Sequence, residues 1–136
     1  MSFAEINGLK VYYEVHGEGE ETVMLLHHGF GCLKIWRNIF GRFVDAGYRV
    51  VMYDRRGFGR SEDGPDFFGF YVSDGYRPET VGELRSVKEA LGIGPCHLVG
   101  QCEGGVLAVD YAARYPEDVW TLTAASTQCY SEMPMT

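Results

Sequence analysis

The six residues Gly100-Gln101-Cys102-Glu103-Gly104-Gly105 combine a nucleophilic side chain with a spacing that can expose it. They lie between two apolar segments, as expected where a strand turns sharply into a helix. Such a turn pushes its middle side chain clear of the sheet, and the residues two positions away must be small to avoid the adjacent backbone. We therefore interpret Cys102 as a nucleophile, with Gly100 and Gly104 permitting the turn. The alternative is a buried cysteine in a glycine-rich turn.

Glu103 has two opposing effects on this interpretation. The N-terminus of a following helix would stabilise a Cys102 thiolate. A neighbouring carboxylate would raise the pKa of the thiol unless it points away, and it could serve as a base only if it turned inward. The backbone N–H of Glu103, in contrast, directly follows the nucleophile and could donate to an oxygen that becomes negative during acyl transfer.

The segment His27-His28-Gly29-Phe30-Gly31 could supply the second donor of such an oxyanion hole. The Phe30 backbone N–H is the candidate, with Gly29 as a supporting residue. The rival interpretation is a nucleotide-binding loop, which needs G-x-G-x-x-G. After Gly29 and Gly31, the third position is Lys34, so this pattern is broken.

The segment 54–61, with the sequence DRRGFGRS, is interpreted as architectural. Its glycines permit a bend after a strand, and Asp54 can accept hydrogen bonds from backbone amides in the turn. A catalytic Asp54 is the alternative.

The elements that must position these motifs alternate between short apolar strands and amphipathic helices. We expect a hairpin over 3–17, turning at Asn7-Gly8, and strands over 22–29, 49–54, 96–100 and 120–127. Helices are expected over 32–48, 78–93 and 104–116, with a loop over 55–76. This order predicts an α/β fold, with a mostly parallel sheet flanked by helices and an N-terminal β-hairpin. All three glycine-rich motifs fall at the carboxyl ends of strands, where ligands bind in such sheets. Aromatic residues 67–71 in the loop could cover an apolar pocket or pack on their own domain.

Composition narrows the class of protein. The chain of 136 residues is long enough for one domain, and 46% hydrophobic and 23% charged residues are typical of a globular one. A net charge of −7 disfavours nucleic acid and anionic membranes as partners, but it does not identify a substrate. We expect a small-molecule substrate. None of the four cysteines forms a C-x-x-C pair, so a zinc site is not expected. We predict no metal and no cofactor. Without a visible export signal or membrane span, we expect reduced thiols and a cytoplasmic location.

HHGFG, DRRGFGRS and GQCEGG, in this order, resemble the motifs of the α/β-hydrolase superfamily. The family pattern is H-G, D-x-R-G-x-G-x-S and G-x-S-x-G, so only the nucleophile departs. The form G-x-C-x-G-G is similar to that of dienelactone hydrolases and polyhydroxyalkanoate synthases, whereas DRRGFGRS is closer to esterases, C–C hydrolases and epoxide hydrolases. The resemblance implies that residues 1–136 are the N-terminal half of one α/β-hydrolase domain, ending where a cap region begins. It also implies that His28 supports the oxyanion loop.

The same resemblance implies an acid and a histidine later in the fold, because the triad runs nucleophile, acid, histidine. His97 lies roughly 16 Å from Cys102 along a strand, too far for a hydrogen bond. His28 is better placed but has its supporting role, and His16 belongs to the surface of the hairpin. We therefore expect a second polypeptide that carries the cap, the acid and the histidine.

Two further considerations bear on that partner chain. Segment 120–127 would be an apolar sheet edge if nothing covered it. The partner could arise by cleavage near Thr136, including self-cleavage by Cys102, or be encoded apart. An engineered or truncated fragment is the alternative.

The predicted function is a cysteine-dependent hydrolase that acts on an ester, thioester or activated carbonyl through a covalent acyl-Cys102 intermediate. Two alternatives are an acyltransferase that uses the same cysteine and a non-catalytic binding subunit with the same fold. Cys32 follows the oxyanion loop, so it could form a regulatory disulfide with Cys102 or simply line the site.

Overall fold

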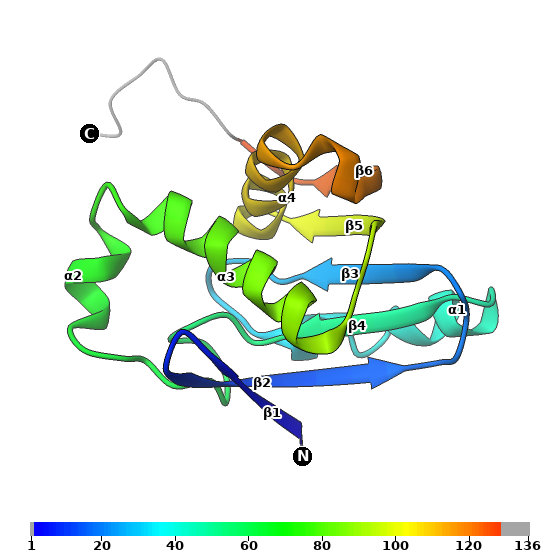
Figure 1. The fold of residues 1–136 in the computed structure, drawn as a ribbon, viewed down its shortest axis with the longest axis horizontal. Coiled ribbons are helices and arrows are strands. Elements are labelled where there is room, and N and C mark those ends of the chain that lie inside the picture. Colours follow the sequence, from blue (N-terminus) through cyan, green and yellow to red (C-terminus); the bar gives the residue numbers. More distant parts are fainter. Residues whose placement is uncertain (1, 129–136) are drawn as a thin grey trace.

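A six-stranded sheet forms the centre of the computed structural model, which describes residues 2–128 (Figure 1). Its strands are β1 (Ser2–Ile6), β2 (Leu9–His16), β3 (Thr22–Leu26), β4 (Arg49–Tyr53), β5 (Cys96–Gln101) and β6 (Val119–Ala125), in the spatial order β1-β2-β4-β3-β5-β6. The last four of these, β4, β3, β5 and β6, run parallel, and β2 is antiparallel to both of its neighbours. The predicted mostly parallel α/β sheet is thereby confirmed.

The first two strands form the predicted hairpin. Ile6 pairs with Leu9 across a two-residue turn. Asn7 and Gly8 both adopt positive φ angles, of 52° and 83°. This conformation matches the twist of the strands, and asparagine and glycine tolerate it best.

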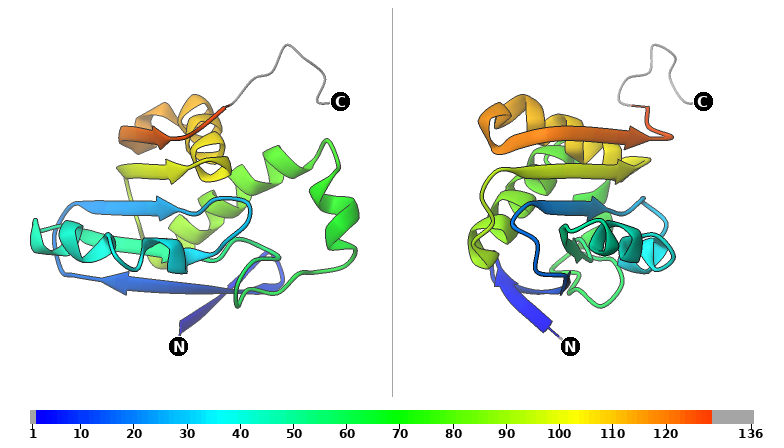
Figure 2. Two further views of the ribbon diagram at one scale, coloured as in Figure 1. Left: turned by 180° about the vertical axis from the view of Figure 1, so that it is seen from behind. Right: turned by 90° about the vertical axis from the view of Figure 1, so that its right-hand side faces the viewer.

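Helices cover both faces of the sheet (Figures 1 and 2). One face carries α3 (Tyr76–Leu91) and α4 (Glu103–Arg114), and the other carries the 3₁₀ helix η1 (Leu33–Trp36) and α1 (Phe40–Asp45). The short helix α2 (Phe67–Tyr71) lies beyond the carboxyl ends of the parallel strands, and the 3₁₀ helix η2 (Pro116–Asp118) leads into β6. Within residues 2–128, no helix is long and apolar enough to cross a membrane.

The central strand β3 shows why the sheet needs both layers. All five of its side chains are buried. Met24 and Leu26 pack in the cluster that contains α3 and α4, whereas Val23 and Leu25 pack with η1. Successive side chains of a strand point to opposite faces, so this continuous apolar run is the sign of a strand buried on both sides.

The expected helix over 32–48 is wrong in one respect, because the structure divides it into η1 and α1. The backbone leaves the helical conformation at Ile39, with φ −120° and ψ −39°. β-branched residues, asparagine and glycine have weak helical propensity, and this segment holds Ile35, Asn38, Ile39 and Gly41. The apolar spacing there therefore produced two short helices rather than one long one.

The expected loop over 55–76 is also wrong in part, since it contains α2. Asp66 caps that helix, with its side chain accepting a hydrogen bond from the Gly69 N–H at 3.2 Å. Helix α3 begins at Tyr76, two residues before the expected start at Pro78. Proline is tolerated there because the first N–H groups of a helix have no partner within it.

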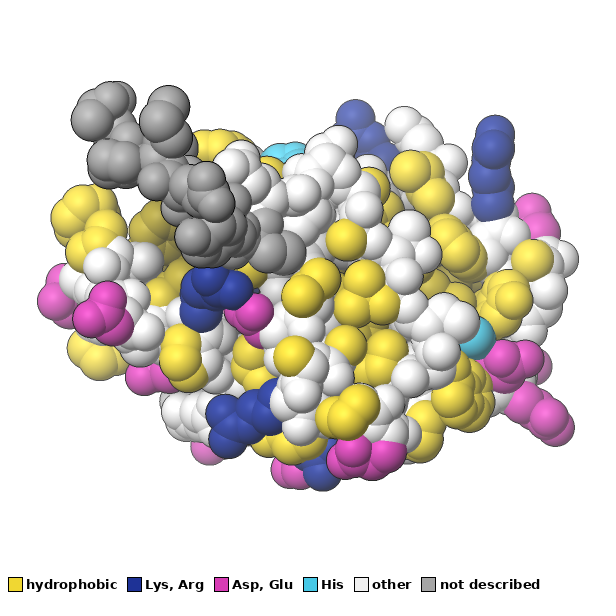
Figure 3. All heavy atoms as spheres, turned by 90° about the horizontal axis from the view of Figure 1, so that it is seen from above, with side chains coloured by type: hydrophobic (Ala, Val, Ile, Leu, Met, Phe, Trp, Pro, Cys, Tyr) yellow, Lys and Arg dark blue, Asp and Glu magenta, His cyan; other side chains and the backbone are white. Residues whose placement is uncertain are grey.

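Strand β6 lies at one edge of the sheet and is poorly covered. Figure 3 shows this side of the molecule, where hydrophobic and uncharged groups occupy the middle and charged groups gather toward the margins. Trp120 is among the exposed hydrophobic side chains. This agrees with the prediction that the segment would form an apolar edge.

Candidate functional site

Cys102 occupies the turn between β5 and α4 in a strained backbone conformation. Its φ of 53° and ψ of −116° lie in a region that side-chain-bearing residues rarely adopt. Its N–H donates to Ala125 O at 2.8 Å, and its own carbonyl accepts from Thr127 Oγ1 at 3.2 Å. The side chain is exposed, which excludes the alternative of a buried cysteine.

The flanking glycines are required because backbone atoms occupy the space of a side chain. A Cβ on Gly104 would lie 2.7 Å from His27 O and closer still to Leu26 O. A Cβ on Gly100 would lie 2.6 Å from Gly105 N and closer still to Gly104 O. The collision predicted for larger residues two positions from Cys102 is therefore confirmed.

A hollow of about 710 Å³ opens beside Cys102. Its walls come from the start of α3, the start of α4 and the residues that follow α2. Tyr71, Tyr76, Val106 and Leu107 supply much of the apolar lining. A size of this order suits a small-molecule substrate.

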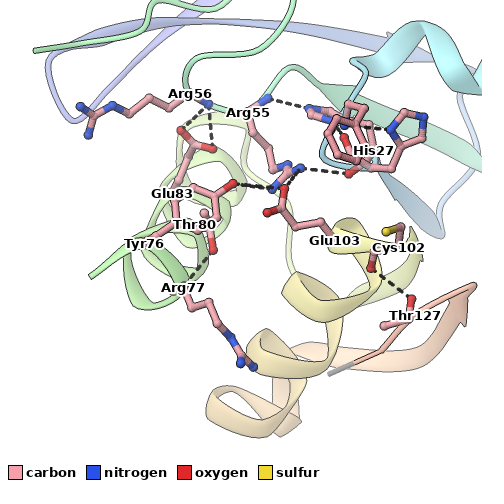
Figure 4. Close-up of polar contacts among 12 residues, drawn as sticks. His27, Arg55, Arg56, Tyr76, Arg77, Thr80, Glu83, Cys102, Glu103 and Thr127 are labelled. Atoms are coloured by element: carbon pink, nitrogen blue, oxygen red, sulfur yellow. Dashed lines mark hydrogen bonds and ion pairs between the residues drawn. The ribbon is translucent and has the colours of Figure 1, made fainter. Parts of the chain in front are cut away.

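Arg55 crosses beneath this hollow as a buried cation (Figure 4). Its Nη2 donates to Glu103 Oε2 at 2.8 Å and to His27 O at 3.2 Å, and its Nη1 donates to Tyr76 OH at 3.2 Å. The Tyr76 hydroxyl donates to the same Glu103 oxygen at 3.2 Å. Burial raises the pKa of Tyr76, so this hydroxyl stays protonated.

The Glu103 carboxylate is thus held by Arg55 and Tyr76, on the side away from the Cys102 sulfur (Figure 4). We expected this carboxylate to oppose a Cys102 thiolate unless it pointed away from the sulfur. In the structure it points away (Figure 4). The position of Glu103 also explains why residue 29 is a glycine, because a Cβ there would lie 2.9 Å from Glu103 Oε2. The Glu103 backbone N–H, the predicted oxyanion donor, is the first in α4 and directly follows Cys102.

His27 is a site residue that sequence reasoning missed. The buried ring accepts a hydrogen bond from Arg55 N at Nε2, at 3.1 Å, and therefore carries its proton on Nδ1, which donates to His28 O at 2.7 Å. Burial and the nearby Arg55 charge lower the pKa of His27 to about 3. The neutral ring fixes the loop over residues 27–31 to the segment after β4. The sequence feature that could have identified His27 is its position directly after the apolar run of β3.

The loop itself is closed by His28. The Phe30 N–H donates to His28 Nδ1 at 3.1 Å, and the Phe30 side chain is 95% exposed. A Cβ on Gly31 would lie 2.7 Å from the His28 ring. The amide expected to bind the oxyanion is therefore engaged by His28 in this structure.

Asp54 has the architectural role predicted for it. Its Oδ2 accepts from Arg60 N at 2.9 Å and its Oδ1 accepts from Leu33 N at 2.8 Å. It therefore ties the turn after β4 to the start of η1.

The remaining histidines are held by other groups. His97 contacts Glu21 and Thr121, each at 2.7 to 2.8 Å, at the start of β5. His16 contacts Glu14 at 2.8 Å and is partly buried rather than fully on the surface. None of the four histidines forms a hydrogen bond to Cys102 within residues 2–128.

The other cysteines lie in different settings. Cys32 lines a separate hollow beside Asp54, and it is a free thiol, as is Cys102. Cys96 is buried, with Lys88 Nζ at 3.1 Å, and burial raises its pKa. Cys129 lies outside the described residues.

The aromatic segment after β4 divides its side chains between two tasks. Phe67 packs on Phe58 and Phe70 packs on Tyr76, so these rings cover their own domain. Tyr71 lines the Cys102 hollow, and Phe68 is exposed. Both expectations for this segment are met, by different residues.

Comparisons with known proteins agree with this geometry. A model of the alpha/beta hydrolase fold matches residues 22–136. The chain is 36% identical over 120 residues to a 2-hydroxy-6-oxo-6-phenylhexa-2,4-dienoate hydrolase of Comamonas testosteroni, a match that covers 86% of this chain and 40% of the relative. It is 31% identical over 129 residues to a proline iminopeptidase of Clostridioides difficile strain 630, covering 92% of this chain and 42% of the relative.

A solved structure gives the same result. A protein from a study of carboxylesterases of Nitrososphaera gargenis superposes with a TM-score of 0.86 at 27% identity, over 97% of this chain and 47% of that one. The chain spans about two fifths of the length of the curated relatives named above. By its motifs, its sheet and these matches, the chain belongs to the alpha/beta hydrolase fold family.

Proposed function

We propose that this chain carries the nucleophile of a cysteine-dependent hydrolase that acts on an ester, thioester or activated carbonyl. The conformation of Cys102 is the observation that carries the proposal: a strained φ of 53° on an exposed turn at the start of α4. Strained backbone persists where the surrounding structure fixes it, and it gathers at active sites. The two relatives named above are a hydrolase and a peptidase, which supports hydrolytic chemistry in this family.

In the proposed reaction, the Cys102 thiolate attacks the carbonyl carbon and a carbon–sulfur bond forms. The carbonyl oxygen takes up negative charge and is bound by the Phe30 and Glu103 N–H groups. The Phe30 N–H exchanges its bond to His28 for this one. The bond to the leaving alcohol or thiol then breaks, and the leaving group takes a proton. Water hydrolyses the acyl-Cys102 thioester and regenerates the thiol.

The proton acceptor lies outside residues 2–128 in this proposal. His27 is neutral and fully engaged, and Glu103 is held by Arg55. We assign the base to a histidine, supported by an acid, in the part of the hydrolase fold that the longer relatives have beyond the matched region. Residues 1–136 then form the N-terminal part of one domain.

Two other functions make different predictions. Transfer of the acyl group to an acceptor other than water would use the same Cys102 chemistry, and it would be favoured by an acyl-thioester substrate. A non-catalytic binding subunit would keep the fold and leave Cys102 dispensable.

Alkylation by iodoacetamide at neutral pH tests the nucleophile. Peptide mass spectrometry over time gives the rate at each cysteine of the native protein. Cys102 should react at least about tenfold faster than Cys32, because its side chain is exposed at the start of α4 whereas Cys32 is partly buried. Buried Cys96 serves as the slow reference. A Cys102 rate no greater than those of Cys32, Cys96 and Cys129 would contradict the proposal and favour the binding subunit.

A further inference from the structure

The charged groups around the Cys102 hollow are unequally matched. Two arginines and three acidic residues line it: Arg55, Arg77, Asp74, Glu103 and Asp110. Arg77 is held on Asp110 by two hydrogen bonds, of 2.9 and 2.7 Å, and Arg55 is held on Glu103. Asp74 is exposed and has no partner among the described residues. The lining therefore carries one uncompensated negative charge.

The Arg55–Glu103 pair presents its acidic member to the hollow. The Arg55 side chain is 2% exposed and the Glu103 side chain is 24% exposed. The outer nitrogens of Arg55 bind Glu103, Tyr76 and the His27 carbonyl, and its Nε is buried. An anion placed against this pair would therefore meet the Glu103 carboxylate, with no Arg55 donor open to it. The Arg77 guanidinium is 53% exposed, and two of its nitrogens already bind Asp110.

We propose that the hollow beside Cys102 selects substrates with a positively charged or uncharged group near the reacting carbonyl, and disfavours those with a carboxylate there. This inference rests on the proposed function for the identity of the nucleophile. The Glu103 carboxylate and the exposed Asp74 both line this hollow, so a charged group of a substrate bound there comes within the range of their charges. The rings of Tyr71 and Tyr76 line the same hollow, and aromatic faces attract cations further.

Two methanethiosulfonates of similar size, one with an ethylammonium head and one with an ethylsulfonate head, measure this preference. Both convert a thiol to a mixed disulfide and release methanesulfinate, so only their charge differs. Peptide mass spectrometry of the native protein gives both rates at each cysteine. The quantity of interest is the rate of the cationic reagent divided by that of the anionic one.

Cys32 is the internal reference for this ratio. Its hollow is lined by Glu14, Asp54, Lys34 and Arg60, whose charges balance, and it experiences the same net charge of −7. The ratio at Cys102 should exceed that at Cys32 by about tenfold, because opposite reagent charges respond in opposite directions to nearby carboxylates. Equal ratios at the two cysteines, or a lower one at Cys102, would overturn the proposal.

Three charge-neutralising variants locate the effect. Glu103→Gln should lower the Cys102 ratio by about tenfold, and Asp74→Asn by about threefold because water screens an exposed charge. Glu117→Gln is the matched control, since Glu117 is exposed on η2, at the opposite end of β6. It should leave the ratio unchanged. If the Cys102 ratio fell equally in Glu117→Gln and Glu103→Gln, the effect would come from net charge alone. That result would overturn the proposal.

The outcomes remain separable from those of the proposed function. If Glu103→Gln does not fold, Asp74→Asn still decides, and an unchanged ratio in that variant counts against the inference. The absolute alkylation rate of Cys102 tests the nucleophile, whereas the ratio of rates tests the charge preference. Rapid alkylation of Cys102 without a charge preference would contradict this inference and leave the proposed function intact.

Discussion

Replacing Gly104 by alanine tests whether close backbone packing fixes the turn that presents Cys102. The new Cβ would lie 2.7 Å from His27 O and the Leu26 carbonyl carbon, below the 3.0 Å that real Cβ atoms respect. These obstacles are backbone atoms of β3 and the loop after it, so no side chain can turn aside. Overpacking costs about 1 to 3 kcal/mol when side chains can adjust. For Gly104→Ala we expect a loss of about 3 kcal/mol or more in the free energy of unfolding.

Urea denaturation followed by circular dichroism measures this loss. A loss of about 3 kcal/mol lowers the midpoint by about 1 to 3 M urea for a slope typical of small domains. Gly82→Ala is the matched control, because Gly82 lies inside α3 with open space around it. That change should raise the stability by about 0.5 to 1 kcal/mol, since alanine favours a helix more than glycine does. A Gly104→Ala protein within about 0.5 kcal/mol of wild type would refute the packing argument.

Two further predictions concern buried charges. Burial raises the pKa of Glu83 from 4.5 to about 7, so the folded state holds its proton more tightly than the unfolded state. This favours folding at low pH and is lost as pH rises. The free energy of unfolding of wild type relative to Glu83→Gln should therefore fall by up to about 3 kcal/mol between pH 4.5 and 7 in urea titrations, and parallel profiles would contradict this. Lys88 and Arg85 both pair with Asp118, with side chains 2% and 39% exposed. Lys88→Met should lower the thermal and urea stability by about 3 kcal/mol and Arg85→Met by less than about 1, whereas equal losses would show that burial does not set the difference.

The sequence predicted the elements whose signals are local. The apolar run of β3, the Asn7-Gly8 turn and the small residues around Cys102 each report on backbone within a few positions. A strand buried on both faces must be continuously apolar, and a tight turn must have small neighbours. These constraints appear in a single chain without any knowledge of its partners in space.

The parts that escaped prediction depend on contacts between distant segments. Arg55, Tyr76 and Glu103 come from three separate segments of the chain, and nothing in their spacing shows that they share hydrogen bonds. In the sequence, His27 simply follows an apolar strand. Its neutral state follows only from its burial beside Arg55. The break between η1 and α1 at Ile39 is a further case, because apolar spacing alone does not show whether a helix continues.

The ion pair between Arg55 and Glu103 also bears on the proposed role of Cys102 as a nucleophile. A carboxylate beside a thiol was an objection to thiolate chemistry, and the structure places it against a buried cation instead. The same bond joins the segment after β4 to the turn at Cys102, while Arg55 N joins it to His27. Arg55 therefore connects the two segments that carry the proposed oxyanion donors, Phe30 and Glu103.

Trapping of an acyl-enzyme tests the central claim most directly. The native protein is mixed briefly with p-nitrophenyl acetate, quenched in acid, and mapped by peptide mass spectrometry. The account predicts an acetyl thioester on Cys102, formed ahead of any on Cys32, released by hydroxylamine and absent from Cys102→Ala. Acetyl groups that are absent from Cys102, or equally abundant on Cys32, would contradict a nucleophilic role for this residue.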